Sequence, residues 1–341
     1  MSPISRRLPA LIAVFLAGLL LTGCAETLRM GLPTASPALT DDAVVVADGT
    51  RLPLRRWLPG DGRSPRAVVL ALHGYNDYAN GFDAAASYWA GRGIATFAYD
   101  QRGFGRHDRA GLWSSTEALS SDAAATLWLL HQAYPNTPLY LLGHSMGGAV
   151  AATVVTGTGS PGLTVPPLDG LILVAPAVWA RETMPGYQRL ALEVGARMIP
   201  GIRLSPDGLD ITPSDNVEML RALGRDPLVL TDSRVDALEG LVNLMDRAYL
   251  SIPDLPSSTL MLYGDREEVI PLETVDMLLE RVDLGRVRVA FYEQGYHMLL
   301  RDLQARTVWD DIVAWIVTVG GPLPSGADRR GSERHGALVE R

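Results

Sequence analysis

A serine flanked by glycines is the first candidate for chemistry in this sequence, within the segment Gly143-His144-Ser145-Met146-Gly147. An apolar run precedes this segment at 139–142, and small residues follow it at 148–152. A serine on a sharp turn between a strand and a helix holds a strained backbone, so the positions two before and two after it need very small side chains. Both of these positions carry glycine. The pattern therefore predicts a nucleophile elbow in which the Ser145 hydroxyl attacks a substrate.

A serine nucleophile needs a general base, and chains with such an elbow place an acid and then a histidine later in the sequence. His297 fits this order because it follows a strand-like run at 287–292 and a turn-like segment at 293–295, and it precedes an amphipathic helical pattern. The other histidines either precede Ser145 or, in the case of His335, lie in a polar C-terminal segment. We therefore expect His297 to be the base.

Three carboxylates that could orient this histidine follow the apolar run at 259–263, namely Asp265, Glu267 and Glu268. One of them is expected to hold the imidazole in position and to stabilise the imidazolium that forms when it takes the serine proton. Aspartate and glutamate both serve in this role. The residue types alone leave the three open.

The negative charge that develops on a substrate carbonyl oxygen needs two backbone N–H groups, which together form an oxyanion hole. Met146, the residue after the nucleophile, supplies one of them. The second is expected from the loop after the apolar run at 67–72, where the candidate is the amide of Tyr75. Gly74 allows the backbone to approach the substrate closely, and His73 is expected to brace the loop rather than to transfer protons.

Together these motifs resemble those of α/β-hydrolases of the monoglyceride lipase and lysophospholipase group of serine hydrolases. The resemblance covers roughly residues 41–320. It is carried by Leu72-His73-Gly74, the segment 99–106, the elbow at Ser145, the segment 264–271 and Gly295-Tyr296-His297.

In that group the acid is usually an aspartate three residues after a glycine and shortly before Val-Pro or Ile-Pro. The matching position here is Glu267, counted from Gly264 and from Ile270-Pro271, so the resemblance implies a triad with glutamate in place of aspartate. It also implies a structural role for Asp100 and Arg102, which buttress the floor near the active site in such proteins. From the residues alone, the segment around them is equally compatible with a solvated turn.

The pattern of secondary structure around these residues predicts an α/β fold, with a mainly parallel central sheet and helices on both faces. Strand-like and helical stretches alternate from residue 67 onward, and an antiparallel hairpin precedes them around Asp48-Gly49. The predicted hydrolase core comprises residues 41–175 and 255–320.

Residues 176–254 are predicted to be an inserted helical cap, because more than eighty residues between two strands exceed what a crossover helix requires. Apolar residues of this insertion either line a tunnel for an acyl chain or form the core of the cap. They are Trp179, Met184, Tyr187, Leu190, Met198, Ile199, Met219, Leu220, Leu244 and Met245.

Composition excludes several functions. All thirty basic residues are arginine, which rules out chemistry that depends on a catalytic lysine, such as a Schiff base. The formal net charge of -8 gives no electrostatic reason to expect a nucleic acid partner. The histidines are scattered without metal-ligand spacing, so neither a metal nor a cofactor is expected.

The N-terminus is typical of an export signal, with Arg6 and Arg7 before an apolar stretch at 8–21. The segment 21–24 resembles a bacterial lipobox, which implies a signal peptide over 1–23 and acylation of Cys24, the only cysteine. An acylated Cys24 would attach the protein to a membrane surface of the bacterial cell envelope. A transmembrane anchor is the alternative. We expect residues 24–40 to be a flexible tether and residues 321–341 to be disordered.

These observations predict a serine carboxylic-ester hydrolase that acts on a lipid-derived ester, either a monoacylglycerol or a lysophospholipid. Two other activities use the same fold and elbow, namely aminopeptidase-like hydrolysis and acyl transfer. A third alternative is a catalytically silent lipoprotein that uses the fold to bind a partner. The order of serine, acid and late histidine favours the hydrolase.

Overall fold

The computed structural model describes residues 26–60, 62, 64–206 and 208–339. The predicted signal peptide and Cys24 lie outside the described residues. Within them, no helix is both long enough and apolar enough to cross a bilayer.

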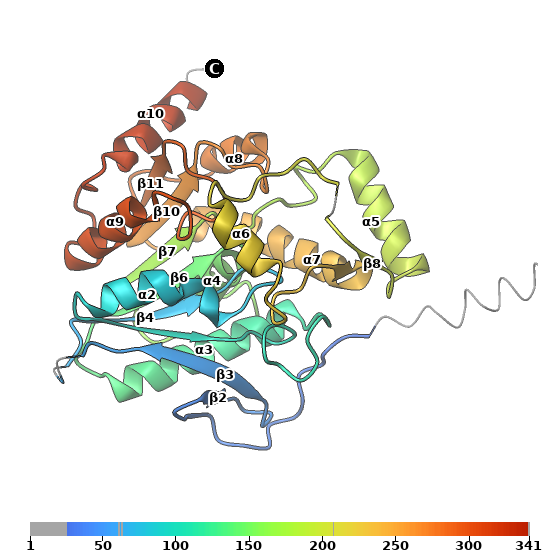
Figure 1. The fold of residues 1–341 in the computed structure, drawn as a ribbon, viewed down its shortest axis with the longest axis horizontal. Helices are drawn as coiled ribbons and strands as arrows, with labels where there is room; N and C mark the ends of the chain where they lie inside the picture. Colours follow the sequence, from blue (N-terminus) through green and yellow to red (C-terminus); the bar gives the residue numbers. More distant parts are fainter. Residues whose placement is uncertain (1–25, 61, 63, 207, 340–341) are drawn as a thin grey trace, which may run out of the picture.

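A nine-stranded sheet forms the centre of the molecule, in the order β1-β2-β3-β5-β4-β6-β7-β10-β11 (Figure 1). Pairing is antiparallel from β1 to β5 and parallel from β5 to β11. The hairpin of β2 and β3 agrees with the antiparallel start expected from the sequence. The strands span Ala38–Leu39 (β1), Ala43–Val45 (β2), Arg51–Trp57 (β3), Ala67–Leu72 (β4), Ile94–Tyr99 (β5), Leu139–His144 (β6), Gly170–Val174 (β7), Thr259–Gly264 (β10) and Val287–Tyr292 (β11).

Two apolar cores lie on opposite faces of the sheet, because successive side chains of a strand point to opposite sides. In β4, Val68, Leu70 and Leu72 belong to one core, while Ala67, Val69 and Ala71 belong to the other. The first core packs against α3, α4 and α8, and the second against α2 and α9. These helices span Asp83–Ala90 (α2), Thr116–Ala133 (α3), Met146–Thr156 (α4), Leu272–Leu279 (α8) and Ala305–Val317 (α9), with a short 3-10 turn η1 at Ala79–Phe82. The observed architecture is the predicted α/β fold.

The segment predicted as a cap consists of helices α5, α6 and α7, a two-stranded ribbon of β8 and β9, and a 3-10 turn η2. Helix α7 packs on α4 and contributes Leu244 and Tyr249 to the first core, whereas Ala196 is the one buried residue of α5. Helix α5 lies at the edge of the molecule (Figure 1). The elements span Gly186–Met198 (α5), Arg203–Leu204 (β8), Val217–Leu223 (α6), Ser233–Arg234 (β9), Val235–Ser251 (α7) and Ile252–Asp254 (η2).

The expectation of a disordered C-terminal segment at 321–341 is wrong, because Ala327–Val339 forms helix α10, which packs beside β11 (Figure 1). Gly331 permits this approach, since a Cβ there would lie 2.2 Å from the carbonyl oxygen of Val289. The Arg330 Nε donates to the Phe291 carbonyl at 2.9 Å. The helix is held by polar contacts and a close backbone approach, which a count of apolar residues does not detect.

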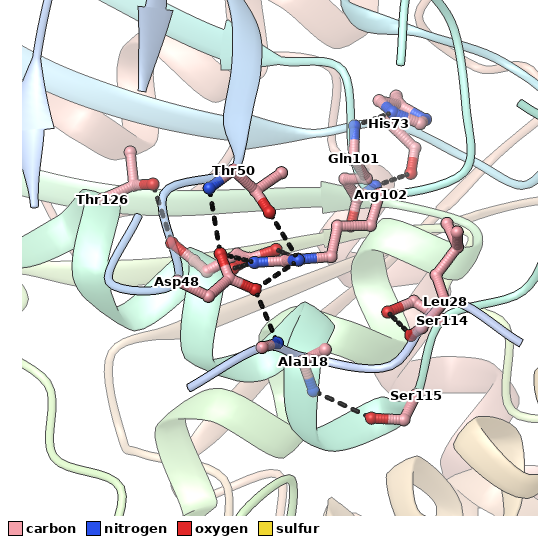
Figure 2. A network of polar contacts seen from close by, with 12 residues as sticks. Leu28, Asp48, Thr50, His73, Gln101, Arg102, Ser114, Ser115, Ala118 and Thr126 are labelled. Atoms are coloured by element: carbon pink, nitrogen blue, oxygen red, sulfur yellow. Dashed lines mark hydrogen bonds and ion pairs between the residues drawn. The ribbon is translucent and has the colours of Figure 1, made fainter. Parts of the chain in front are cut away.

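The flexible tether expected at 24–40 is also docked on the core in part. Leu28 is buried, and its N–H donates to the Trp113 carbonyl at 2.7 Å. The Ser114 hydroxyl donates to the Leu28 carbonyl at 3.2 Å (Figure 2). Proline and small residues describe the composition of this segment correctly, but one buried leucine and its backbone hydrogen bonds hold it in place.

Candidate active site

The turn between β6 and α4 has the geometry of a nucleophile elbow. Ser145 has φ 52° and ψ -117°, a conformation that L-residues rarely adopt. A Cβ on Gly143 would lie 2.2 Å from the Gly147 carbonyl oxygen, and a Cβ on Gly147 would lie 2.1 Å from the Leu72 carbonyl oxygen. Both glycines are therefore sterically required. The turn places Ser145 at the carboxyl end of a central parallel strand.

Of the three candidate acids, the structure brings Glu267 to His297. Its Oε2 lies 2.7 Å from the His297 Nδ1, and both side chains are buried. The other oxygen of Glu267 accepts the N–H groups of Val269 and Ile270 at 2.8 and 3.0 Å, so the carboxylate is held at both ends. A carboxylate partner fixes the proton on Nδ1, which leaves the Nε2 lone pair of His297 available as a base.

The two other carboxylates point elsewhere. Asp265 is exposed, and burial on one side together with the nearby charge of Glu293 raises its pKa against the opposing effect of two arginines. Glu268 is exposed and accepts the backbone N–H of Thr212, a residue of the cap, at 2.6 Å. Glu267 is buried while Asp265 and Glu268 are exposed, so only one of the three carboxylates reaches the histidine.

The histidine beside the nucleophile has a role that the sequence analysis did not assign. The His144 Nε2 donates to the backbone carbonyl of His297 at 3.1 Å. Burial, with a smaller contribution from the neighbouring His297, lowers the pKa of His144 to about 3. His144 is therefore neutral at ordinary pH and serves as a fixed hydrogen-bond donor to the loop of the candidate base. The only sequence signal for this role was the position of His144 directly before Ser145.

The loop after β4 has the bracing contacts expected of His73. The Gln101 N–H donates to the His73 Nε2 at 2.9 Å (Figure 2). The proton therefore lies on Nδ1 and is donated to the Gly74 carbonyl at 2.8 Å. Burial lowers the pKa of His73, which keeps the ring neutral. A neutral imidazole with both nitrogens occupied braces the loop and has no free lone pair for proton transfer.

The candidate oxyanion donors lie on either side of the nucleophile. Met146 is the first residue of α4, and the first amides of a helix have no acceptor within it. Gly74 passes close over the serine, since a Cβ at Gly74 would lie 3.3 Å from the Ser145 Cβ. Tyr75 follows in the same loop and lines the same cavity as Ser145. Positive φ at Asn76 (62°) turns the loop sharply after it, a conformation that asparagine tolerates better than most residues.

Arg102 and Asp100 form the floor below this loop, as the resemblance implied. The Arg102 guanidinium binds Asp48 through Nη1 at 2.8 Å (Figure 2). Its Nε binds Asp122 at 2.6 Å. Asp100 accepts the backbone N–H groups of Ala79 and Arg106. These contacts connect the antiparallel start of the sheet to α3, which supports a structural role and not a solvated turn.

A cavity of about 550 Å³ opens in front of Ser145 and His297. Most of its wall is apolar, and much of that wall comes from the cap, including Trp179, Leu209, Ile211, Leu230 and Met245. Of the cap residues proposed from the sequence, Trp179 and Met245 line this cavity, whereas Tyr187, Leu190 and Met198 are exposed and Leu244 belongs to the first core.

Three polar residues that the sequence analysis missed also line this cavity, namely Asn76, Asp77 and Arg301. Asp77 and Arg301 form an ion pair that is largely shielded from solvent. No short sequence motif predicts this ion pair, because its two residues lie more than two hundred positions apart in the chain. Among the described residues, no three histidine, cysteine, aspartate or glutamate side chains gather as a metal site.

A serine on such an elbow, with an acid–histidine pair on loops after later strands of a parallel sheet, defines the α/β-hydrolase class. Residues 63–304 match the Hydrolase_4 family model, which is described as serine aminopeptidase S33, and the chain belongs to this family. It is a serine hydrolase with the α/β-hydrolase fold, similar to monoglyceride lipases.

Named relatives support this assignment along most of the chain. The chain is 28% identical to a monoacylglycerol lipase of Mycolicibacterium smegmatis, over 79% of this chain and 94% of the relative. It is 27% identical to monoglyceride lipase of Homo sapiens, over 80% of this chain and 89% of the relative. The solved monoacylglycerol lipase of Paleococcus ferrophilus shares the fold at a TM-score of 0.63 and 21% identity, over 80% of this chain and all of that chain.

Proposed function

We propose that this protein is a serine carboxylic-ester hydrolase of the monoacylglycerol lipase or lysophospholipase type, with Ser145, Glu267 and His297 as its triad. The observation that carries the proposal is the buried hydrogen bond between His297 and Glu267, at the wall of the apolar cavity that also contains Ser145. That arrangement supplies a nucleophile, a base with a free Nε2 and a carboxylate that stabilises the protonated base.

The reaction proceeds in two halves. His297 Nε2 takes the proton of Ser145 while the serine Oγ attacks the ester carbonyl, and the amides of Tyr75 and Met146 stabilise the oxyanion. The protonated His297 then gives its proton to the leaving alcohol, which leaves an acyl-enzyme. Water attacks this acyl-enzyme with His297 as base, and collapse of the second intermediate releases the acid and restores the serine.

The cavity supports a long acyl chain as the part of the substrate that is recognised. A volume of about 550 Å³ lies within the range that suits a lipid-sized ligand, and an apolar wall has no hydrogen bonds to lose when a hydrocarbon chain displaces water. The names of the relatives from Mycolicibacterium smegmatis and Homo sapiens point to the same ester class.

Aminopeptidase activity is a second candidate because the family model carries that description. An aminopeptidase must bind the ammonium of a free N-terminus, for which a carboxylate is the natural partner. Among the described residues that line the cavity, Asp77 is the one carboxylate, and it is bound to Arg301. This pairing disfavours ammonium recognition and favours the ester substrate.

We also propose that acylation of Cys24 attaches the enzyme to a membrane surface of the cell envelope, as the lipobox resemblance implies. Mass spectrometry of the membrane fraction tests this point. A mature N-terminus that is not an acylated Cys24 would contradict it.

A fluorophosphonate probe and a panel of esters test the function. The wild-type protein should be labelled, and Ser145→Ala should lose both labelling and hydrolysis, because the probe reacts with an activated serine. Activity should rise from short to long acyl chains and should exceed activity on aminoacyl amides. Labelling that persists in Ser145→Ala would remove this serine from the mechanism, and a preference for aminoacyl amides would favour the peptidase.

A further inference from the structure

A short segment of the cap crosses both loops that carry the candidate acid and base. We name residues 212–216 the strap. The Thr212 N–H donates to the Glu268 Oε2 at 2.6 Å, and the Met298 N–H donates to the Pro213 carbonyl at 3.0 Å. Glu268 and Met298 directly follow the candidate acid and the candidate base in the chain. Two adjacent residues of the strap therefore connect the two loops.

The next residue of the strap reaches the other side of the histidine through a buried carboxylate. The Ser214 hydroxyl donates to the Asp302 Oδ1 at 2.6 Å, and the Asp302 Oδ2 accepts the Tyr296 N–H at 2.8 Å. Ser214 is 1% exposed and Asp302 is 4% exposed, so water does not substitute for these contacts. The Asn216 amide donates to the Arg301 carbonyl at 2.9 Å, which holds the far end of the strap.

The backbone on both sides of His297 is consequently fixed by the strap. The N–H before it binds Asp302, the N–H after it binds Pro213, and its own carbonyl binds His144. Proton transfer depends on the distance and angle between the imidazole and the serine hydroxyl, and a displacement of about 1 Å can cost about a hundredfold in rate.

We propose that the strap positions His297 for proton transfer, with Ser214 and Asp302 as its positioning residues. This inference rests on the proposed function, and it makes the cap a structural part of the triad as well as a wall of the cavity.

The full-length protein and its Ser214→Ala and Asp302→Ala variants test the proposal, with a short-chain and a long-chain p-nitrophenyl ester as substrates. We expect kcat to fall about tenfold or more for both esters while KM stays within about twofold, because the base is displaced and the cavity is not. Ser214→Thr keeps the hydroxyl and should restore most of kcat. The low-field NMR signal of the His297 Nδ1 proton should weaken or broaden in Ser214→Ala.

Ser251→Ala is the matched control. Ser251 is also a buried cap serine, but its hydroxyl donates to the Arg247 carbonyl at 2.7 Å, away from the histidine loop. This variant should lower the melting temperature and leave kcat and the His297 signal unchanged. If neither Ser214→Ala nor Asp302→Ala folds, Asp215→Ala is the substitute. It removes only the exposed side-chain contact to the Leu303 N–H and should still lower kcat about threefold.

Two results would overturn the proposal. In the first, the variants melt earlier while kcat stays within twofold of wild type, which would make the strap merely structural. In the second, KM rises for the long-chain ester alone, which would make it a cavity wall. A wild-type protein without labelling that depends on Ser145 would instead refute the proposed function.

Discussion

The proposed nucleophile and its proposed base are held in place by different means. Ser145 is fixed by backbone contacts, because Gly143 and Gly147 leave no space for a side chain where α4 meets the sheet. His297 is fixed by its hydrogen bonds with Glu267 and His144 and by the bond between the strap and the adjacent Met298, so that three other parts of the chain hold it. Steric exclusion over a few residues therefore suffices for the serine, whereas the histidine depends on a hydrogen-bond network that the loss of single side chains can weaken stepwise.

The largest effect is expected at the elbow. Gly147→Ala should give no correctly folded, active enzyme, because its Cβ would lie 2.1 Å from the Leu72 carbonyl oxygen and backbone cannot move aside cheaply. Gly336→Ala is the control, since a Cβ there meets nothing within 4 Å and alanine favours a helix. Circular dichroism and ester hydrolysis measure the two outcomes. An active Gly147→Ala enzyme would show that the elbow tolerates adjustment as the histidine loop does.

The second effect concerns the acid. Glu267→Gln keeps the shape of the side chain but removes the charge that stabilises the imidazolium, so kcat should fall on the order of a thousandfold or more. Asp265→Asn should change kcat by less than about twofold, because Asp265 is exposed and its charge is screened by water. Steady-state kinetics with one ester compare the variants. A larger loss of kcat in Asp265→Asn than in Glu267→Gln would contradict the assignment of Glu267 as the acid.

The third effect concerns how the free energy of unfolding depends on pH through His144. Burial lowers the pKa of His144 from 6.5 to about 3, so the unfolded chain binds a proton in this range that the native state does not. The native state should therefore lose stability as pH falls below 6.5 towards 3, by roughly 2 to 3 kcal/mol between about pH 7 and about pH 4.5.

His144→Asn removes the titrating group, so urea unfolding of this variant should depend less on pH over the same interval. Its kcat should also fall, because His297 loses the donor to its carbonyl. An equal pH dependence in both proteins would mean that His144 titrates normally and contributes little to the network.

The smallest effect is expected where neither region is touched. Arg334 of α10 binds Asp276 at 2.7 Å, and both side chains are about 29% exposed, so Arg334→Ala should cost about 1 kcal/mol or less of unfolding free energy. Thermal unfolding and kcat are measured together, and kcat should stay unchanged. A lower kcat would extend the network that holds the histidine loop as far as the C-terminal helix.

The glycine-flanked serine, the late histidine and the loop at 73–75 were accessible to sequence reasoning because each depends on residues that are neighbours in the chain. Glu267 was selected from three carboxylates by counting from Gly264 and Pro271, and the structure brings that residue to the histidine. The ion pair of Asp77 and Arg301 and the strap could not be found in this way, because their partners are joined only by folding.

Errors of the sequence analysis occurred at the two ends of the described chain. A low apolar content suggested disorder, yet α10 docks through arginine contacts and one close approach at Gly331, and the N-terminal segment docks through Leu28. Such contacts depend on surfaces that other segments provide. Composition indicates how much apolar surface a segment can bury by itself, but not which contacts the rest of the molecule can make with it.

The class of fold and the candidate nucleophile could be read from the amino-acid sequence, because strand and helix periodicity and the absence of side chains at a sharp turn are local properties. Tertiary structure decided which cap residues line the cavity, what holds the histidine loop, and whether the carboxylate implied by the family resemblance reaches His297. Those outcomes depend on distances between segments that lie far apart in the chain, and only the packed sheet and cap set these distances.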